Sequence, residues 1–192
     1  IGLHVSPHVY DLGERFQIDG RLPRDDEVVG LLRRVLPALR QHRRSRFGTP
    51  TYFEATCAMA FTRFADAACD LAVIEVGLGG LYDTTNAIDR SDKLAVITRL
   101  GLDHQGILGV TLPEIAFQKA GILPRDGEAV VLRPEDRVAW AVIQGVAAER
   151  RCRIHVVEPP EPGDGPTPHL AEDELLVRAT LVSATVVTLG YT

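Results

Sequence analysis

The stretch Ile74-Glu-Val-Gly-Leu-Gly-Gly-Leu-Tyr-Asp-Thr-Thr-Asn86 contains the strongest structural signal in this chain. The apolar run that leads into it, Asp70–Ile74, predicts a buried strand that ends near Glu75. Three glycines follow within four positions, and glycine permits backbone angles and close approaches that other residues disfavour. The polar residues that close the stretch suit a turn or a helix start. Because ligands of open α/β sheets bind outside the carboxyl ends of the strands, the stretch predicts a ligand site.

The length and composition indicate a folded chain with one sizeable core, or one domain with a fragment of a second. With 192 residues, of which 45% are apolar, the chain is long enough to bury one sizeable core. Its net charge of −5 argues against nucleic acid as a partner. No run approaches the about 20 apolar residues that a membrane-spanning helix needs, so no membrane partner is expected. The three scattered cysteines form no CxxC pair, which favours the reducing cytoplasm.

Strands and helices alternate along the chain. The hydrophobic periodicity predicts a helix that begins near Asp25, with Val28, Leu31, Leu32, Val35 and Leu39 on one face and Pro37 interrupting or kinking it. Further helices are expected at Thr51–Ala68, after the capping box Thr111-Leu-Pro-Glu114, and at Pro134–Arg151; strands are expected at Ile1–Val5, Asp70–Val76, Leu94–Leu100, Glu128–Leu132 and Arg153–Val157. This order predicts an α/β fold with a mostly parallel sheet flanked by helices.

The last part of the chain has a different composition. Pro159–Pro168 is rich in proline and glycine and predicts a loop or linker. Leu175–Thr192 is rich in Leu, Val and Thr, which fits a β-hairpin added at a sheet edge.

Two residues that can bind a metal follow successive predicted strands. Glu75 and His104 lie at carboxyl ends that can be neighbours in a sheet, and a carboxylate with an imidazole suggests a divalent metal. Taken alone, a histidine after an aspartate, such as His104, is more often a hydrogen-bonded structural residue than a metal ligand. Lys119 either pairs with Glu75 or holds a phosphate. No GxxxxGK[ST] phosphate loop occurs in the chain. These residues alone do not identify a substrate.

Two other groups of residues have alternative interpretations. The basic segment Arg40–Arg46 could grip phosphate, but a solvated helix end explains it as well. The aromatic residues of Thr51–Ala68 fit a core stripe, although Tyr52 and Phe53 lie in the first turn and could face a ligand.

Several motifs in order resemble one enzyme family. They are Ser6-Pro-His-Val9, Glu14-Arg-Phe-Gln-Ile-Asp-Gly20, Thr51-Tyr-Phe-Glu54, Glu75-Val-Gly-Leu-Gly-Gly80 with Asp83-Thr-Thr-Asn86, Gly101-Leu-Asp-His104 with Leu108-Gly109, and Lys119-Ala-Gly-Ile122. Over about Ile1–Val157 this set is similar to folylpolyglutamate synthase, often bifunctional with dihydrofolate synthase and related to the Mur ligases. The resemblance implies a Mur ligase-like central domain of P-loop NTPase type.

The resemblance also implies an activity. Members of the family activate the carboxylate of dihydropteroate or folate with ATP as an acyl phosphate, and the amine of L-glutamate then attacks it. The expected ligands are therefore these small molecules together with Mg²⁺, and the expected state is a monomer in the cytoplasm.

Site residues are carried over by position. Glu75 and His104 resemble the magnesium ligands, and Lys119 resembles the lysine that carries a carbamate, which presents a hard oxygen anion to magnesium. The segments that resemble the substrate-holding parts are Thr51, Tyr52, Phe53 and Glu54, and Tyr82, Asp83 and Thr84.

The chain departs from the family pattern in four respects. It lacks the phosphate loop that precedes Ser6 in the family, and it lacks the His-Gln motif with the C-terminal domain. Leu81 stands where arginine is usual, and Arg99 stands where asparagine is usual. We therefore expect residues 1–157 to be part of an ATP-binding central domain, and residues 158–192 to be a linker and hairpin of the same domain. This stretch alone is not expected to turn over.

Two other functions are compatible with these residues. One is a Mur-type amino-acid ligase that acts on cell-wall precursors. The other is a non-catalytic folate-binding protein without a phosphate loop. The segments Ser6–His8 and Thr51–Glu54 favour the folate-type ligase over the first alternative.

Overall fold

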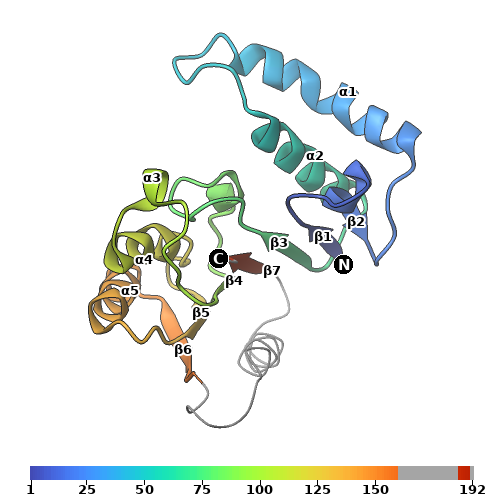
Figure 1. The fold of residues 1–192 in the computed structure, drawn as a ribbon. Coiled ribbons are helices and arrows are strands. Elements are labelled where there is room, and N and C mark those ends of the chain that lie inside the picture. Colours follow the sequence, from blue (N-terminus) through green and yellow to red (C-terminus); the bar gives the residue numbers. More distant parts are fainter. Residues whose placement is uncertain (160–185, 191–192) are drawn as a thin grey trace. The chain divides into compact units, whose positions relative to one another are not determined.

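The computed structural model describes residues 1–159 and 186–190. The chain divides into two compact units, Ile1–Ile74 and Glu75–Thr192, which are described separately (Figure 1). Both units combine strands with helices, so the predicted α/β class is confirmed.

The first unit holds a small sheet and two long helices. Its elements are β1 (Gly2–His4), the 3-10 helix η1 (Leu12–Phe16), β2 (Gln17–Ile18), α1 (Asp25–His42), α2 (Tyr52–Asp66) and β3 (Ala72–Glu75), whose last residue starts the second unit. The central strand β1 pairs antiparallel with β2 and parallel with β3. The strands predicted at Ile1–Val5 and Asp70–Val76 are confirmed, although each is shorter than expected.

The core of this unit forms where α1 and α2 pack on η1. Its fully or nearly buried members are Phe16, Leu31, Val35, Met59, Ala60 and Phe64. One prediction for α1 is wrong, because the side chain of Leu32 is 43% exposed. Of the two alternatives for Pro37, an interruption is ruled out, because the helix continues through Pro37 to His42. Burial of Leu31 and Val35 in this core stabilises the helix around the proline, so tertiary packing overrides the local preference.

The second unit contains most of the parallel sheet. Its elements are η2 (Thr84–Ala87), β4 (Lys93–Ile97), α3 (Gln105–Leu108), α4 (Leu112–Ala120), β5 (Glu128–Leu132), α5 (Arg137–Arg150), β6 (Arg153–Val157) and β7 (Val186–Gly190). The strands run parallel in the order β7-β4-β5-β6. Of the predicted C-terminal hairpin only β7 is described, and the other predicted strand lies outside the described residues, as does the linker beyond Pro159.

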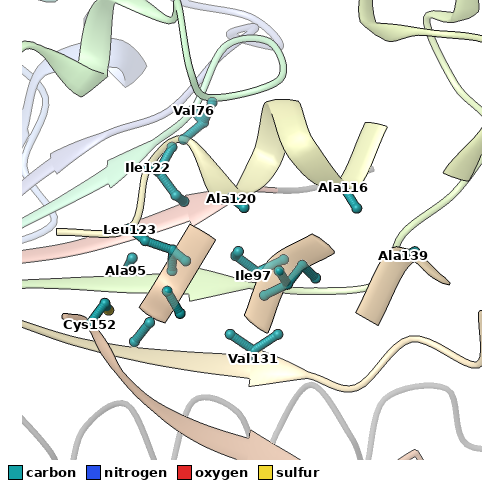
Figure 2. Packing of buried hydrophobic residues seen from close by; sticks show 13 residues of the cluster. Val76, Ala95, Ile97, Ala116, Ala120, Ile122, Leu123, Val131, Ala139 and Cys152 are labelled. Carbon is teal, nitrogen blue, oxygen red and sulfur yellow. The ribbon is translucent and has the colours of Figure 1, made fainter. Parts of the chain in front are cut away.

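The core of the second unit lies between α4, α5 and one face of the sheet (Figure 2). Alternate residues of β4 and β5, Ala95, Ile97, Ala129 and Val131, face the helices. The helices contribute small residues such as Ala116, Ala120 and Ala147, together with Ile143. Small side chains on the helices allow close packing against the strands, and all these residues are at most 4% exposed.

Three helix starts carry the same reciprocal cap. In each, a side chain of the N-cap residue accepts a backbone N–H, and a glutamate three residues later accepts the N–H of the N-cap residue. The pairs are Asp11 with Glu14, Thr51 with Glu54, and Thr111 with Glu114. The capping box predicted at Thr111 is therefore confirmed.

Two expectations from composition concern the described residues. None of their helices has both the length and the apolar character needed to cross a bilayer. Cys57, Cys69 and Cys152 are all free thiols.

Candidate functional site

A pocket of the second unit lies where β3 and β4 end. Its walls are the loop after β3, the loop after β4, α3 and α4; it is lined by Val76, Gly77, Leu78, Gly79, Gly101, Asp103, His104, Leu108, Ile115 and Lys119. The two loops that sequence analysis placed at one sheet edge thus line a common pocket, and His104 and Lys119 both belong to it.

The glycine loop after β3 is shaped by its contact with α4. Gly79 and Gly80 have φ of 68° and 150°, which side-chain-bearing residues rarely adopt. A Cβ on Gly80 would lie 2.9 Å from the carbonyl oxygen of Gln118, and one on Gly121 would lie 2.3 Å from Cα of Leu81. The loop therefore packs against the end of α4 with a glycine on each side of the contact, Gly80 in the loop and Gly121 at the end of the helix. This close contact fixes the backbone next to Lys119.

Polar side chains tie the same loop together. Asp83 accepts hydrogen bonds from the N–H groups of Leu78 and Thr85 and from the Thr85 hydroxyl. The amide of Asn86 donates to the carbonyl oxygens of Leu81 (3.2 Å) and Gly121 (3.0 Å). Asp83 and Asn86 thus already have partners inside the unit that account for their presence.

Lys119 is a buried lysine in the wall of the pocket. Its exposed fraction is 7%, and burial lowers the pKa of its ammonium group, while the charge of Asp103 opposes that shift. A lowered pKa increases the share of neutral amine, which is the nucleophilic form. The position suits a lysine that reacts or binds an anion.

Asp103 and His104 form the exposed side of the pocket. The backbone of His104 is left-handed, with φ of 50°, and its N–H donates to Asp103 Oδ1 at 2.7 Å. The ring atom Nε2 lies 3.6 Å from Asp103 Oδ2, and both side chains are more than half exposed. A non-glycine residue in this conformation stores strain, which is frequent at functional sites.

Comparisons with known proteins identify the family. No family model matches the chain. Residues of the chain are 37% identical over 158 positions to a folylpolyglutamate synthase of Arabidopsis thaliana, covering 82% of this chain and 27% of that protein. They are 36% identical over 145 positions to the dihydrofolate synthase/folylpolyglutamate synthase of Bacillus subtilis, covering 75% and 33%. The chain belongs to the folylpolyglutamate synthase family. It spans about a third of the length of these curated relatives.

A solved structure confirms the fold of this family member. An FPGS complex with AMPPCP and folate matches 81% of the chain and 37% of its own, at 34% identity and a TM-score of 0.73. The Mur ligase-like architecture expected from the resemblance is therefore confirmed.

The predicted metal ligands are only partly brought together. His104 lines the pocket, whereas Glu75 is the partly buried last residue of β3 and does not line it. Among the described residues, no three His, Cys, Asp or Glu side chains form a group that could hold a metal ion. Mg²⁺ commonly keeps several waters and uses one or two carboxylates with substrate phosphates, so the carboxylates at these two strand ends still fit it.

The predicted substrate-holding residues fall in both units of this family member. Thr51 and Glu54 cap α2, Phe53 is partly buried, and Tyr52 is 60% exposed. In the second unit, Tyr82 is 87% exposed, Asp83 caps η2, and Thr84 is its first residue. The role of these residues in binding substrate stays a prediction, although the capping roles of Thr51, Glu54 and Asp83 are structural.

Sequence reasoning gave no role to Arg15, which connects three motifs of the first unit. Its Nε donates to Nδ1 of His8 at 2.9 Å, and its guanidinium lies 5.4 Å from the centre of the Tyr52 ring. Its carbonyl oxygen accepts a hydrogen bond from Nδ1 of the fully buried His4. The sequence did contain a signal for these contacts, because His8, Arg15 and Tyr52 each belong to one of the quoted motifs: Ser6–His8, Glu14–Gly20 and Thr51–Glu54.

Lys93 was also missed. It begins β4, is 3% exposed, and its Nζ donates to Asn86 Oδ1 at 3.1 Å. Burial lowers its pKa to about 8, and the charge of Asp89 offsets part of that effect. Nothing in the sequence distinguishes this lysine from a surface residue at a strand start.

Proposed function

We propose that this protein is an ATP-dependent ligase that adds L-glutamate to dihydropteroate, to folates or to both. The family assignment supports this function, as does the complex of a similar protein with AMPPCP and folate. The observation that carries the proposal is the pocket in which buried Lys119 lies with Asp103 and His104 beside a glycine loop. The names of the relatives favour this substrate class over a cell-wall precursor.

The reaction proceeds in two steps. A carboxylate oxygen of the pteroate or folate attacks the γ-phosphorus of ATP, and ADP leaves with the electron pair of the broken P–O bond. The α-amine of glutamate then attacks the acyl carbon, inorganic phosphate departs, and the amine loses a proton to give the amide. Charge on the transferring phosphoryl group is the main obstacle in the first step.

The residues of the pocket have separate tasks in this scheme. Glu75 and His104 would hold Mg²⁺, which when bound neutralises phosphate charge. Asp103 orients His104, because its carboxylate accepts the backbone N–H of that residue. Gly77 and Gly79 line the pocket, and the contacts of the loop with α4 would hold Lys119 in place beside the phosphates.

Lys119 carries a carbamate in this proposal. Its neutral amine adds to CO₂, a proton is released, and the product places a carboxylate-like group in the pocket. Burial supports this step, because it lowers the pKa of Lys119 and so raises the fraction of neutral amine. The modification also removes the positive charge that would repel a cation.

The test is an assay of the whole gene product. ATP, Mg²⁺, glutamate and either dihydropteroate or a folate are supplied, and mass spectrometry follows the addition of glutamyl residues. Lys119→Met should lower the rate by about 100-fold or more, the scale of losing an electrostatic catalytic group. Lys93→Met is the matched control, because it removes a buried lysine away from the pocket lining and should keep most activity.

Three results would contradict the proposal. They are no glutamyl addition by the wild-type gene product, equal rates for wild type and Lys119→Met, and equal losses for the two lysine variants. The last result would show that loss of a buried lysine, and not loss of this particular amine, causes the effect.

A further inference from the structure

Arg15 is a buried charge in the first unit. Only 6% of its surface is exposed. A guanidinium remains protonated in proteins, and a buried charge is costly unless other groups compensate it. Its surroundings therefore indicate what the site is built to accept.

No carboxylate forms an ion pair with Arg15 among residues 1–159. Its guanidinium contacts Nδ1 of His8 and the face of the Tyr52 ring. The neighbouring carboxylate of Glu14 is already used, because it accepts the N–H groups of Val9, Tyr10 and Asp11. The positive charge of Arg15 thus has only weak compensation in the described part of the chain.

The terminal nitrogens of Arg15 have no hydrogen-bond partner among the described residues and keep some contact with solvent. Neither of them donates a hydrogen bond within residues 1–159 and 186–190. The guanidinium atom that does is Nε, which donates to His8. Across the part of the chain that the structure describes, the side-chain nitrogen or oxygen that is both fully buried and without a hydrogen-bond partner is Nε of Arg63. The terminal nitrogens of Arg15 also lack a partner but are not fully buried, so solvent reaches them. The geometry of the Arg15 fork is nevertheless fixed, because His8 holds Nε and His4 holds the carbonyl oxygen.

We propose that Arg15 binds the carboxylate of an aromatic acid, with the exposed Tyr52 ring supporting the aromatic body. An arginine fork accepts the two oxygens of a carboxylate in parallel, and an exposed aromatic ring offers a stacking face beside it. His8 acts as a positioning residue that orients the fork. This inference rests on the proposed function, since it assigns residues of the first unit to the acid substrate.

The test compares a charged with a neutral probe on the 192-residue chain. Binding of 4-aminobenzoate and of its uncharged analogue 4-aminobenzamide is measured by ligand-detected NMR, and binding of dihydropteroate, which carries the same aromatic carboxylate, by calorimetry. Arg15→Gln should weaken 4-aminobenzoate and dihydropteroate by about tenfold or more, which is the scale of a charge-assisted bidentate contact. Its affinity for 4-aminobenzamide should change less than twofold.

Arg63→Gln is the matched control. It removes another largely buried arginine of the first unit, which lies 3.5 Å from a carboxylate oxygen of Glu27. This variant should bind both probes like the wild type. If Arg15→Gln does not fold, Arg15→Lys and Tyr52→Ala decide: the first should weaken only the charged probe, and the second should weaken both.

The outcomes separate this inference from the proposed function. If dihydropteroate and 4-aminobenzoate bind Arg15→Gln as they bind the wild type, Arg15 is not the carboxylate site, and the ligase proposal stands. If 4-aminobenzoate binding depends on Arg15 but dihydropteroate does not bind, the Arg15 site stands, and dihydropteroate is the wrong acid substrate. If neither carboxylate binds the wild type, or if Arg63→Gln loses as much affinity as Arg15→Gln, the inference is overturned.

Discussion

The loops after β3 and β4 line the same pocket but are built differently. In the first loop, Gly80 packs against the backbone of α4, and Asp83 and Asn86 use their polar atoms on the protein's own backbone. In the second loop, Asp103 and His104 are more than half exposed and contact mainly each other. The first loop is therefore a scaffold for α4, whereas the second presents chemically available groups.

This difference shows that a motif can mark packing as well as chemistry. The glycines after β3 suggest ligand contact in the sequence, yet the contacts of Gly80 and of its counterpart Gly121 are with protein atoms. The effect on a ligand is indirect, because these contacts set the backbone on either side of Lys119. Four measurements test how far the two loops differ.

The largest effect should come from closing the space between the first loop and α4. Gly121→Ala would place a Cβ 2.3 Å from Cα of Leu81, which must shift, and we expect a loss of about 3 kcal/mol in the free energy of unfolding. In α3, which follows the second loop, Gly106→Ala meets no atom within 4 Å and should not destabilise the protein; the higher helix propensity of alanine predicts a gain of up to about 1 kcal/mol. Urea unfolding measures both, and equal effects would remove the distinction between the loops.

A second prediction concerns the buried lysine held by Asn86. The pKa of Lys93 is about 8 in the folded protein against 10.5 as the ordinary value, so between these values the unfolded chain binds more protons. Stability contributed by this residue therefore rises with pH in that window. Relative to Lys93→Met, the wild type should gain about 2 kcal/mol between pH 7 and pH 10.

Comparison with Lys93→Met cancels the pH dependence that comes from other groups, because both proteins contain them. Cys152 titrates in an overlapping range, because burial raises the pKa of its thiol to about 11, but it is present in both proteins. A pH-independent difference between the two unfolding curves would show that Lys93 keeps its ordinary pKa.

The third prediction compares an aspartate from each loop. Asp83→Ala removes the cap of η2 and the acceptor for Leu78 N–H, so we expect a loss of about 1 to 2 kcal/mol. Asp103→Ala removes an exposed side chain and should cost less than about 0.5 kcal/mol. Thermal unfolding compares the two variants, and a larger loss for Asp103→Ala would reverse the assignment of scaffold and presenting loop.

The smallest effect on stability is expected at His104, and it should be a gain. His104→Gly relieves a left-handed backbone and should raise the free energy of unfolding by about 0.5 to 1 kcal/mol. The same variant of the whole gene product should lose ligase activity, because the imidazole is gone. A decrease in stability would mean that the ring makes a structural contribution that outweighs the strain.

Periodicity and local signals predicted most of the fold. The alternation of strands and helices gave the class, and the strands at Glu128–Leu132 and Arg153–Val157 have the predicted bounds. These features depend on neighbours in sequence, and so does the cap at Thr111. The sequence left open whether α1 continues through Pro37, because that depends on packing against α2.

The candidate site was predictable only in outline. The order of strands placed Glu75 and His104 near one sheet edge, and the pocket at that edge is lined by His104 and Lys119 but not by Glu75. The burial of Arg15 and Lys93 depends on residues distant in sequence, so their environments were not readable from the chain. The hydrogen bonds of Asp83 depend on the exact backbone of its loop, which explains why a capping residue resembles a binding residue in the sequence.

The reciprocal caps have a consequence in acid. Glu14, Glu54 and Glu114 each accept N–H groups, which lowers the pKa of all three carboxyl groups below 4.5. Their contribution is present above that value and is lost as the pH falls through the lowered pKa values. Protonation would therefore release three separate helix starts, one at each of η1, α2 and α4, as the pH falls below 4.5. Acid unfolding of both units should share this trigger, even though their cores share no residue.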